Sequence, residues 1–123
     1  MCAKSNCCSA GPTLIFACSG AADVGEVADQ AARKLTKDGL GKMFCLAGIG
    51  GRISGIMKTT EAASKVLAID GCNLDCAKNC LEQAGFMNFE HIRVTDLGLE
   101  KGKTEVTDEN IAKVIEKSSD LLS

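Results

Sequence analysis

The segment TLIFACSGAADVGEVADQAARKLTKDG, residues 13–39, decides the fold class. Its first part, TLIFAC (residues 13–18), is a continuous apolar run, which predicts a buried strand. From about Ala21 to Lys37 apolar residues recur at helical spacing, and Gly39 follows where a helix commonly ends. A buried strand followed by an amphipathic helix indicates one unit of a mostly parallel α/β sheet.

The rest of the chain continues this alternation. Further strands are predicted at residues 43–47, 66–70 and 89–95, and helices at 54–64, at 73–85 and after the N-cap Thr107. The helix at 73–85 is expected to begin at Asn73 and to bury a stripe made of Leu74, Ala77, Leu81 and Ala84. We therefore expect a three-layer α/β/α fold with a mostly parallel four-stranded sheet and a Rossmann-like or flavodoxin-like topology. Ligands of such folds bind at the carboxyl ends of the strands.

Length and composition fit a single domain. The chain has 123 residues and a net charge of −2. We place the domain at residues 12–123, after a flexible cysteine-containing tail of residues 1–11. No Lys/Arg cluster is present and Trp and Tyr are absent, which argues against nucleic-acid binding. No apolar run approaches the roughly 20 residues of a membrane span, so no membrane partner is expected.

The eight cysteines are the main chemical signal in the sequence. The first residues are polar and rich in thiols, without the apolar segment of a secretory signal, so we expect a cytoplasmic protein. In a reducing cytoplasm the cysteines are not expected to form a disulfide framework. Their expected roles are those of metal ligands, catalytic thiols or small buried apolar residues.

Three cysteines lie at or near the carboxyl ends of three successive predicted strands: Cys18, Cys45 and Cys72. Cys76 lies in the first turn of the helix predicted at 73–85, where a helix N-terminus favours the thiolate. Because parallel strands end at one edge of a sheet, we expect these four thiols to converge. Four thiolates in one pocket match tetrahedral Zn²⁺, with Zn–S distances of about 2.3 Å.

Several residues near this predicted site have simpler interpretations. Cys45 fits a small buried apolar residue as well as it fits a ligand, and Cys80, near the edge of the apolar stripe, fits core packing better. Cys76 lies about 120° from the centre of that stripe, so it is not a core position. Asp70 fits equally a hydrogen-bond acceptor or general base at the site and a residue that turns the chain. His91 is interpreted as a partly exposed residue with no role.

The segments around these cysteines resemble a known family. FACSGA (residues 16–21), FCLAGIGG (residues 44–51), and Asp70-Gly71-Cys72 followed by Cys76-Ala77 are similar to the motifs of the DGC-domain family, which is assigned to zinc binding because of its cysteines. The resemblance covers the chain from about residue 13 to the last helix. It implies that the zinc-chelating residues are Cys18, Cys45, Cys72 and Cys76, and it implies no established activity. Cys80 and the tail cysteines Cys2, Cys7 and Cys8 lie outside the pattern; those of the tail are either soft-metal ligands or incidental thiols.

Catalytic cysteine motifs do not match. A phosphatase-type loop needs Cys, five residues and then Arg, but Cys45 reaches Arg52 only after six residues. No Cys-x-x-Cys redox pair is present. We therefore expect a metal-binding protein, with zinc as the ion. The alternative is a thiol-based redox or oxyanion-handling enzyme or sensor using the same cysteines, or an iron–sulfur protein. Whether the protein is an enzyme stays open.

Overall fold

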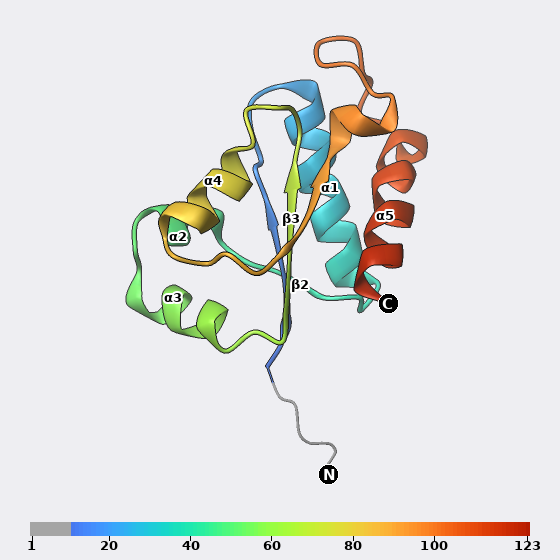
Figure 1. Cartoon of the computed structure of the whole chain (residues 1–123). Helices are drawn as coiled ribbons and strands as arrows, with labels where there is room; N and C mark the ends of the chain where they lie inside the picture. The colour runs from blue at the N-terminus through green and yellow to red at the C-terminus, as the bar shows by residue number, and fades with distance from the viewer. Residues whose placement is uncertain (1–10) are drawn as a thin grey trace.

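The computed structural model describes residues 11–123, and a four-stranded sheet lies at its centre (Figure 1). The strands are β1 (Thr13–Ala17), β2 (Lys42–Met43), β3 (Lys65–Asp70) and β4 (Glu90–Arg93). They lie in the order β2-β1-β3-β4, and every neighbouring pair is parallel. The expected α/β fold is confirmed, and all carboxyl ends of the strands lie at one edge of the sheet. The predicted tail lies outside the described residues except for Gly11.

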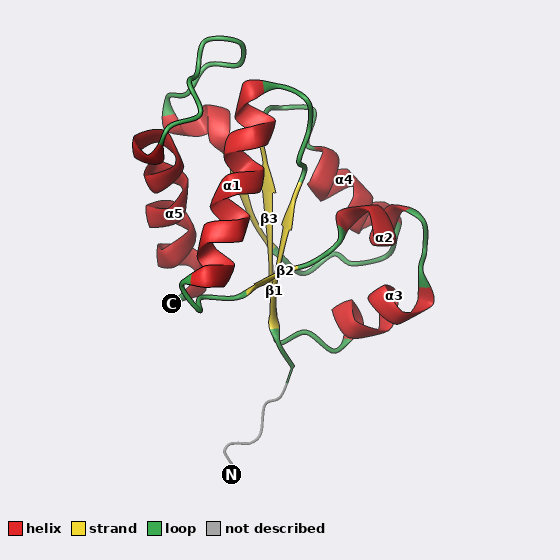
Figure 2. Cartoon of the chain, turned by 180° about the vertical axis from the view of Figure 1, so that it is seen from behind, coloured by secondary structure: helices red, strands yellow, loops and turns green. Residues whose placement is uncertain are grey.

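Helices cover both faces of the sheet (Figure 2). Helices α1 (Asp23–Lys37) and α5 (Asp108–Leu122) cover one face, and α2 (Leu46–Gly50), α3 (Ser54–Glu61) and α4 (Cys76–Gln83) cover the other. Alternate side chains of β1 divide between two cores: Ile15 and Ala17 pack with α1 and α5, whereas Leu14 and Phe16 pack with α2 and α4. Burial on both faces explains why this strand is apolar throughout. Within the described part of the chain, no helix combines the length and apolarity that crossing a membrane requires.

The second strand is much shorter than predicted. The apolar run at residues 43–47 contributes only Met43 to β2, and from Leu46 the chain forms α2. A short apolar run is compatible with either structure. Here the chain leaves the sheet at Phe44, whose ring meets that of Phe16 edge-on with centroids 6.1 Å apart. Cys45 consequently lies between a strand and a helix and not inside a strand.

Helix α4 begins later than the sequence predicts. Asn73 is not its N-cap, because the helix starts at Cys76 and the preceding Asp75 adopts a left-handed conformation with φ of 53°. Leu74, expected in the buried stripe, is 63% exposed, so the stripe starts only at Ala77. The helix needs no cap from a neighbouring residue, because the carboxylate of Asp70, at the end of β3, accepts hydrogen bonds from its first N–H groups.

The last part of the domain differs from the prediction only at the end of its strand. Strand β4 is shorter than the predicted 89–95, because Val94–Leu97 wind into a 3₁₀ helix, η1. Helix α5 begins as predicted, with Thr107 Oγ1 accepting a hydrogen bond from the N–H of Asn110 at 3.2 Å. Between η1 and α5, a loop that starts at Gly98 projects past the carboxyl edge of the sheet (Figure 1).

Candidate metal centre

Five cysteines of the described residues lie at the carboxyl edge of the sheet or in the helix that starts there. Cys18 directly follows β1, Cys45 lies two residues past β2, and Cys72 lies two residues past β3. Cys76 is the first residue of α4, and Cys80 lies one turn further along it. The predictions for Cys2, Cys7 and Cys8 concern residues outside the described part of the chain.

Four of the five cysteines line two separate hollows. Cys18, Cys45 and Cys80 line a cavity of about 950 Å³ beside β2. Cys72 lines a smaller hollow of about 410 Å³, and Cys76 is exposed and lines neither. No three cysteine sulfurs among residues 11–123 lie within 4.8 Å of one another. The thiols are therefore near one another at one edge without being assembled around one point.

Cys18 contacts the loop that follows β3. Its Sγ accepts a hydrogen bond from the backbone N–H of Gly71 at 3.3 Å. Burial raises the pKa of the Cys18 thiol, and hydrogen bonds from the N–H groups of Gly20 and Gly71 oppose this rise. The negative charge of Asp70 raises this pKa further. A cation at this edge would offset these effects and favour the thiolate.

Cys72 lies beside a cation. Its Sγ is 3.6 Å from Nζ of Lys101, which belongs to the loop between η1 and α5. Asp23 holds this loop, since its carboxylate accepts hydrogen bonds from the N–H groups of Gly102 and Thr104, both at 2.9 Å. These two hydrogen bonds lower the pKa of Asp23.

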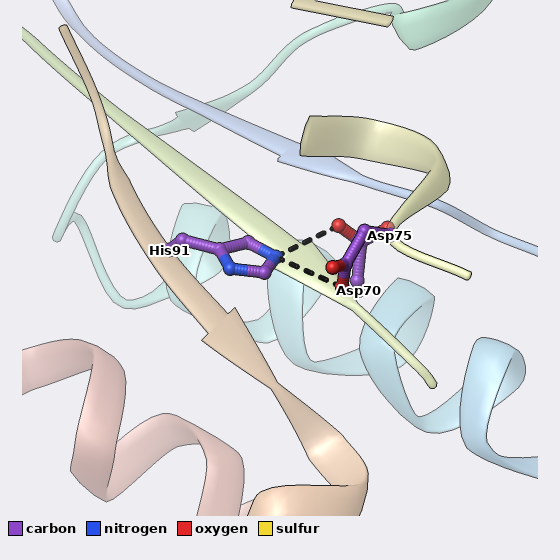
Figure 3. A group of neighbouring side chains, drawn as sticks. All are labelled: Asp70, Asp75 and His91. Carbon is purple, nitrogen blue, oxygen red and sulfur yellow. Dashed lines mark hydrogen bonds and ion pairs between the residues drawn. The ribbon is translucent and has the colours of Figure 1, made fainter. Parts of the chain in front are cut away.

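A buried carboxylate fixes the loop between β3 and α4. Asp70 is 1% exposed, and its oxygens accept hydrogen bonds from the N–H groups of Ala77 at 2.7 Å and Lys78 at 3.1 Å. Nε2 of His91 lies 2.9 Å from the same carboxylate (Figure 3). Asp70 therefore caps α4 from the end of β3, and the first N–H that it accepts belongs to Ala77, the residue after Cys76.

An ion pair ties the other end of this loop to β4. Nη2 and Nε of Arg93 donate to the two carboxylate oxygens of Asp75 at 2.7 and 2.9 Å, and this pairing lowers the pKa of Asp75. His91 and Arg93 are two residues apart on β4, so their side chains lie on the same face of the strand. The loop that carries Cys72 is thus held at both ends by the side chains of β4.

Asp70, Asp75 and His91 offer ligand atoms that lie within 4.8 Å of one another, a group that could hold a metal ion (Figure 3). The two carboxylates already have partners, because Asp70 caps α4 and Asp75 pairs with Arg93. A cation would have to displace these bonds next to a guanidinium group. The group is therefore better suited to supporting the cysteine loop. His91, interpreted from the sequence as a residue with no role, belongs to this group. The sequence signal that could have indicated this is its spacing of two residues from Arg93 along one strand.

Each residue of the Asp70-Gly71-Cys72 turn has its own structural reason. Asp70 caps α4, and Cys72 brings a thiol to the edge. A Cβ on Gly71 would lie 2.8 Å from the backbone nitrogen of Gly25 in α1, so only glycine allows this close approach. The N–H of Gly71 also donates to Cys18 Sγ, at 3.3 Å. The turn therefore joins two of the cysteine-bearing loops.

Together these features define a doubly wound α/β domain with thiols at the carboxyl edge of its sheet. The DGC domain matches residues 14–118, and the chain belongs to this family, as the resemblance of its motifs implies. It is 34% identical over 88 residues to the Anaerobic and virulence modulator AnvM of Pseudomonas aeruginosa, covering 72% of this chain and 67% of that protein. No solved structure matches the chain.

Proposed function

We propose that the protein binds a thiophilic metal ion, zinc, at the carboxyl edge of its sheet through Cys18, Cys45, Cys72 and Cys76. The contact between Cys18 and the turn after β3 is the observation that supports this most directly. The N–H of Gly71 lies 3.3 Å from Cys18 Sγ, which holds the segment bearing two of the other cysteines against the first. Thiolates are soft ligands, and four of them suit zinc far better than a hard cation.

Binding requires the connections at this edge to close around the ion, since Cys18 and Cys45 line one hollow, Cys72 lines another and Cys76 lines neither. Cys45 lies on the short connection between β2 and α2, and Cys72 lies on the loop between β3 and α4. Cys18 directly follows the buried strand β1 and is the expected fixed point. In this proposal the ion organises the two connections. Four thiolates would leave no open coordination position, so storage, structure or sensing is favoured over hydrolysis.

A thiol-based sensor is the second candidate, and one contact favours it. The Nζ of Lys101 lies 3.6 Å from Cys72 Sγ, so this partly exposed thiol has a cationic hydrogen-bond donor beside it. The similarity to a protein named Anaerobic and virulence modulator also supports a response to redox conditions. An iron–sulfur cluster on the same thiolates would combine both roles. Each form requires reduced thiols, which persist in the cytoplasm, where we place the protein.

Elemental analysis of the full chain, purified anaerobically without chelator, tests the proposal. About one zinc per chain is expected, with most of the metal lost from the Cys72→Ser variant. Iron together with acid-labile sulfide would instead identify an iron–sulfur protein. A metal-free chain with freely titratable thiols would overturn the metal proposal and favour the sensor.

A further inference from the structure

Arg52, which follows α2, has a backbone conformation that a residue with a side chain rarely adopts. Within residues 11–123, three residues other than glycine have a positive φ: Ser19, Arg52 and Asp75. Ser19 and Asp75 directly adjoin proposed metal ligands, whereas Arg52, with φ of 58°, does not. The left-handed conformation is unfavourable for such a residue and persists only where the surrounding contacts impose it. The contacts of the Arg52 side chain therefore need their own explanation.

The guanidinium group of Arg52 binds the carboxyl-terminal ends of two helices. Its Nη1 donates to the carbonyl oxygens of Ile49 at 2.7 Å and Gly50 at 3.3 Å, at the end of α2. Its Nη2 donates to the carbonyl oxygen of Gln83, the last residue of α4, at 3.1 Å. A cation is favoured at such a helix end, where the carbonyl groups lack partners within the helix. Arg52 therefore joins α2 to α4.

The short helix α2 connects Arg52 to Cys45. Cys45 is the N-cap of α2, and its carbonyl oxygen accepts a hydrogen bond from the N–H of Ile49 at 3.4 Å. Ile49 thus donates to Cys45 and accepts from Arg52, and its side chain is fully buried in the core that also contains α4. Helix α2 packs against α4, which carries Cys76 and Cys80 (Figure 2). The position of Cys45 relative to these two cysteines therefore depends on how the two helices are held together.

We propose that Arg52 is a positioning residue for Cys45: it fixes α2 on α4 and so holds the Cys45 thiol in place relative to the thiols of α4. This role rests on the proposed function, in which Cys45 and Cys76 bind the same ion. It also explains the near match of Cys45 and Arg52 to an oxyanion loop in another way. Cys45 caps one end of α2 and the guanidinium group binds the other, so the two do not face a common ligand.

The Arg52→Gly variant separates the guanidinium group from the backbone conformation. It removes the hydrogen bonds to both helices and leaves a residue that adopts the left-handed conformation freely, so the turn after α2 is kept. Lys34→Ala is the control, because Lys34 is an exposed cation that pairs with Asp38 on the opposite face of the sheet from α2 and α4. It does not line the cavity that contains Cys45.

Dibromobimane, a reagent that bridges two neighbouring thiols, tests the position of Cys45 without any metal. Cys45 and Cys80 line the same cavity, so peptide mass spectrometry of the full chain, reduced and treated with chelator, should find them bridged. The yield of this bridge should fall several-fold in Arg52→Gly and stay at the wild-type level in Lys34→Ala. Equal yields in the wild type and Arg52→Gly, or no bridge in the wild type, would overturn the positioning role.

Cobalt(II) added to the full chain gives the second readout, because the charge-transfer absorption between thiolate and cobalt reports how many thiolates bind the ion. Arg52→Gly should lose about one quarter of this absorption, as Cys45→Ser should, since one of four ligands leaves. A purely structural role would lower the melting temperature of Arg52→Gly and leave its spectrum as in the wild type, and this result would overturn the proposal. A wild type that binds no cobalt but shows the Arg52-dependent bridge would contradict the proposed metal binding alone.

Discussion

Nε2 of His91 lies 2.9 Å from the buried carboxylate of Asp70, although the two residues are not opposite each other in the sheet. His91 stands opposite Ala68, so its imidazole reaches along β4 toward the end of β3. The same carboxylate accepts hydrogen bonds from the first backbone N–H groups of α4. A single imidazole on an edge strand thus supports the start of the helix that carries Cys76.

Replacing His91 by Leu should lower the free energy of unfolding by about 1–3 kcal/mol, because the buried carboxylate of Asp70 loses a partner that leucine cannot replace. Urea denaturation of the wild type and the variant measures this change. Glu90→Ala, at an exposed position of the same strand, is the control and should stay within about 0.5 kcal/mol of the wild type. Equal stability of all three proteins would show that the imidazole contributes nothing to holding Asp70.

Arg93→Met should destabilise the fold in a pH-dependent way. Arg93 lowers the pKa of Asp75 in the folded state, so the pair contributes stability above the unfolded pKa of about 3.9. That contribution is lost as the pH falls through the folded pKa. The difference in unfolding free energy between wild type and variant should therefore be largest near about pH 7 and shrink below about pH 4.

Urea denaturation at a series of pH values gives this difference directly. Lys103→Met is a matched control, because Lys103 forms an exposed ion pair with Glu100 at 3.6 Å and its loss should change stability little at any pH. A difference for Arg93→Met that stays constant from neutral to acid pH would mean that Arg93 acts by packing and not by its charge.

The layers of the fold could be predicted because burial on two faces is visible in the residue order. Residues 13–17 and 66–70 are apolar up to a single terminal polar residue, and both are central strands. Helix α1 alternates apolar and polar residues at helical spacing, and its apolar side lies in the core as that pattern predicts. Once the ends of these strands were predicted, the position of the cysteines at the carboxyl edge of the sheet followed.

Contacts between side chains that are far apart in the sequence could not be predicted from these local patterns. Asn73 is the obvious local cap for α4. The cap is instead Asp70, which accepts a hydrogen bond from the N–H of Ala77, seven residues further along the chain. The roles of His91 and Arg93 depend on β4 lying next to β3, which no local pattern specifies. The direction of each cysteine side chain depends in the same way on how the connections between strands and helices pack. The positions of the strand ends alone could therefore not predict which cysteines line the same hollow.

Gly71→Ala and Gly55→Ala should change stability in opposite directions. A Cβ at Gly71 would lie 2.8 Å from the backbone nitrogen of Gly25, and backbone cannot move aside as a side chain can, so a loss of about 1–3 kcal/mol is expected. Gly55 lies within α3 with open space where its Cβ would be, so alanine should stabilise by about 0.5–1 kcal/mol. Melting temperatures and urea midpoints of both variants measure the effects. A Gly71→Ala variant as stable as the wild type would show that the close approach at Gly71 does not require glycine.

Cys76 and Cys80 lie one helical turn apart in different surroundings. Cys76 is exposed at the first position of α4, whereas Cys80 is partly buried, packs against the second core and lines the cavity with Cys18 and Cys45. With the proposed ligands, Cys76→Ser should sharply weaken metal retention, because a hydroxyl is a poor, hard substitute for a thiolate. Cys80→Ser should keep the metal and destabilise the fold by about 1–3 kcal/mol where its hydroxyl is buried without a partner.

Bound metal and melting temperature, measured side by side for the two serine variants, separate these roles. The expected pattern is crossed: Cys76→Ser loses metal without a packing defect of its own, and Cys80→Ser loses packing while the metal content holds. Equal metal loss from both variants, or loss only from Cys80→Ser, would mean that Cys76 is the wrong fourth ligand. Cys80 would then take its place, because it already shares a cavity with Cys18 and Cys45 and needs the smaller rearrangement to join them.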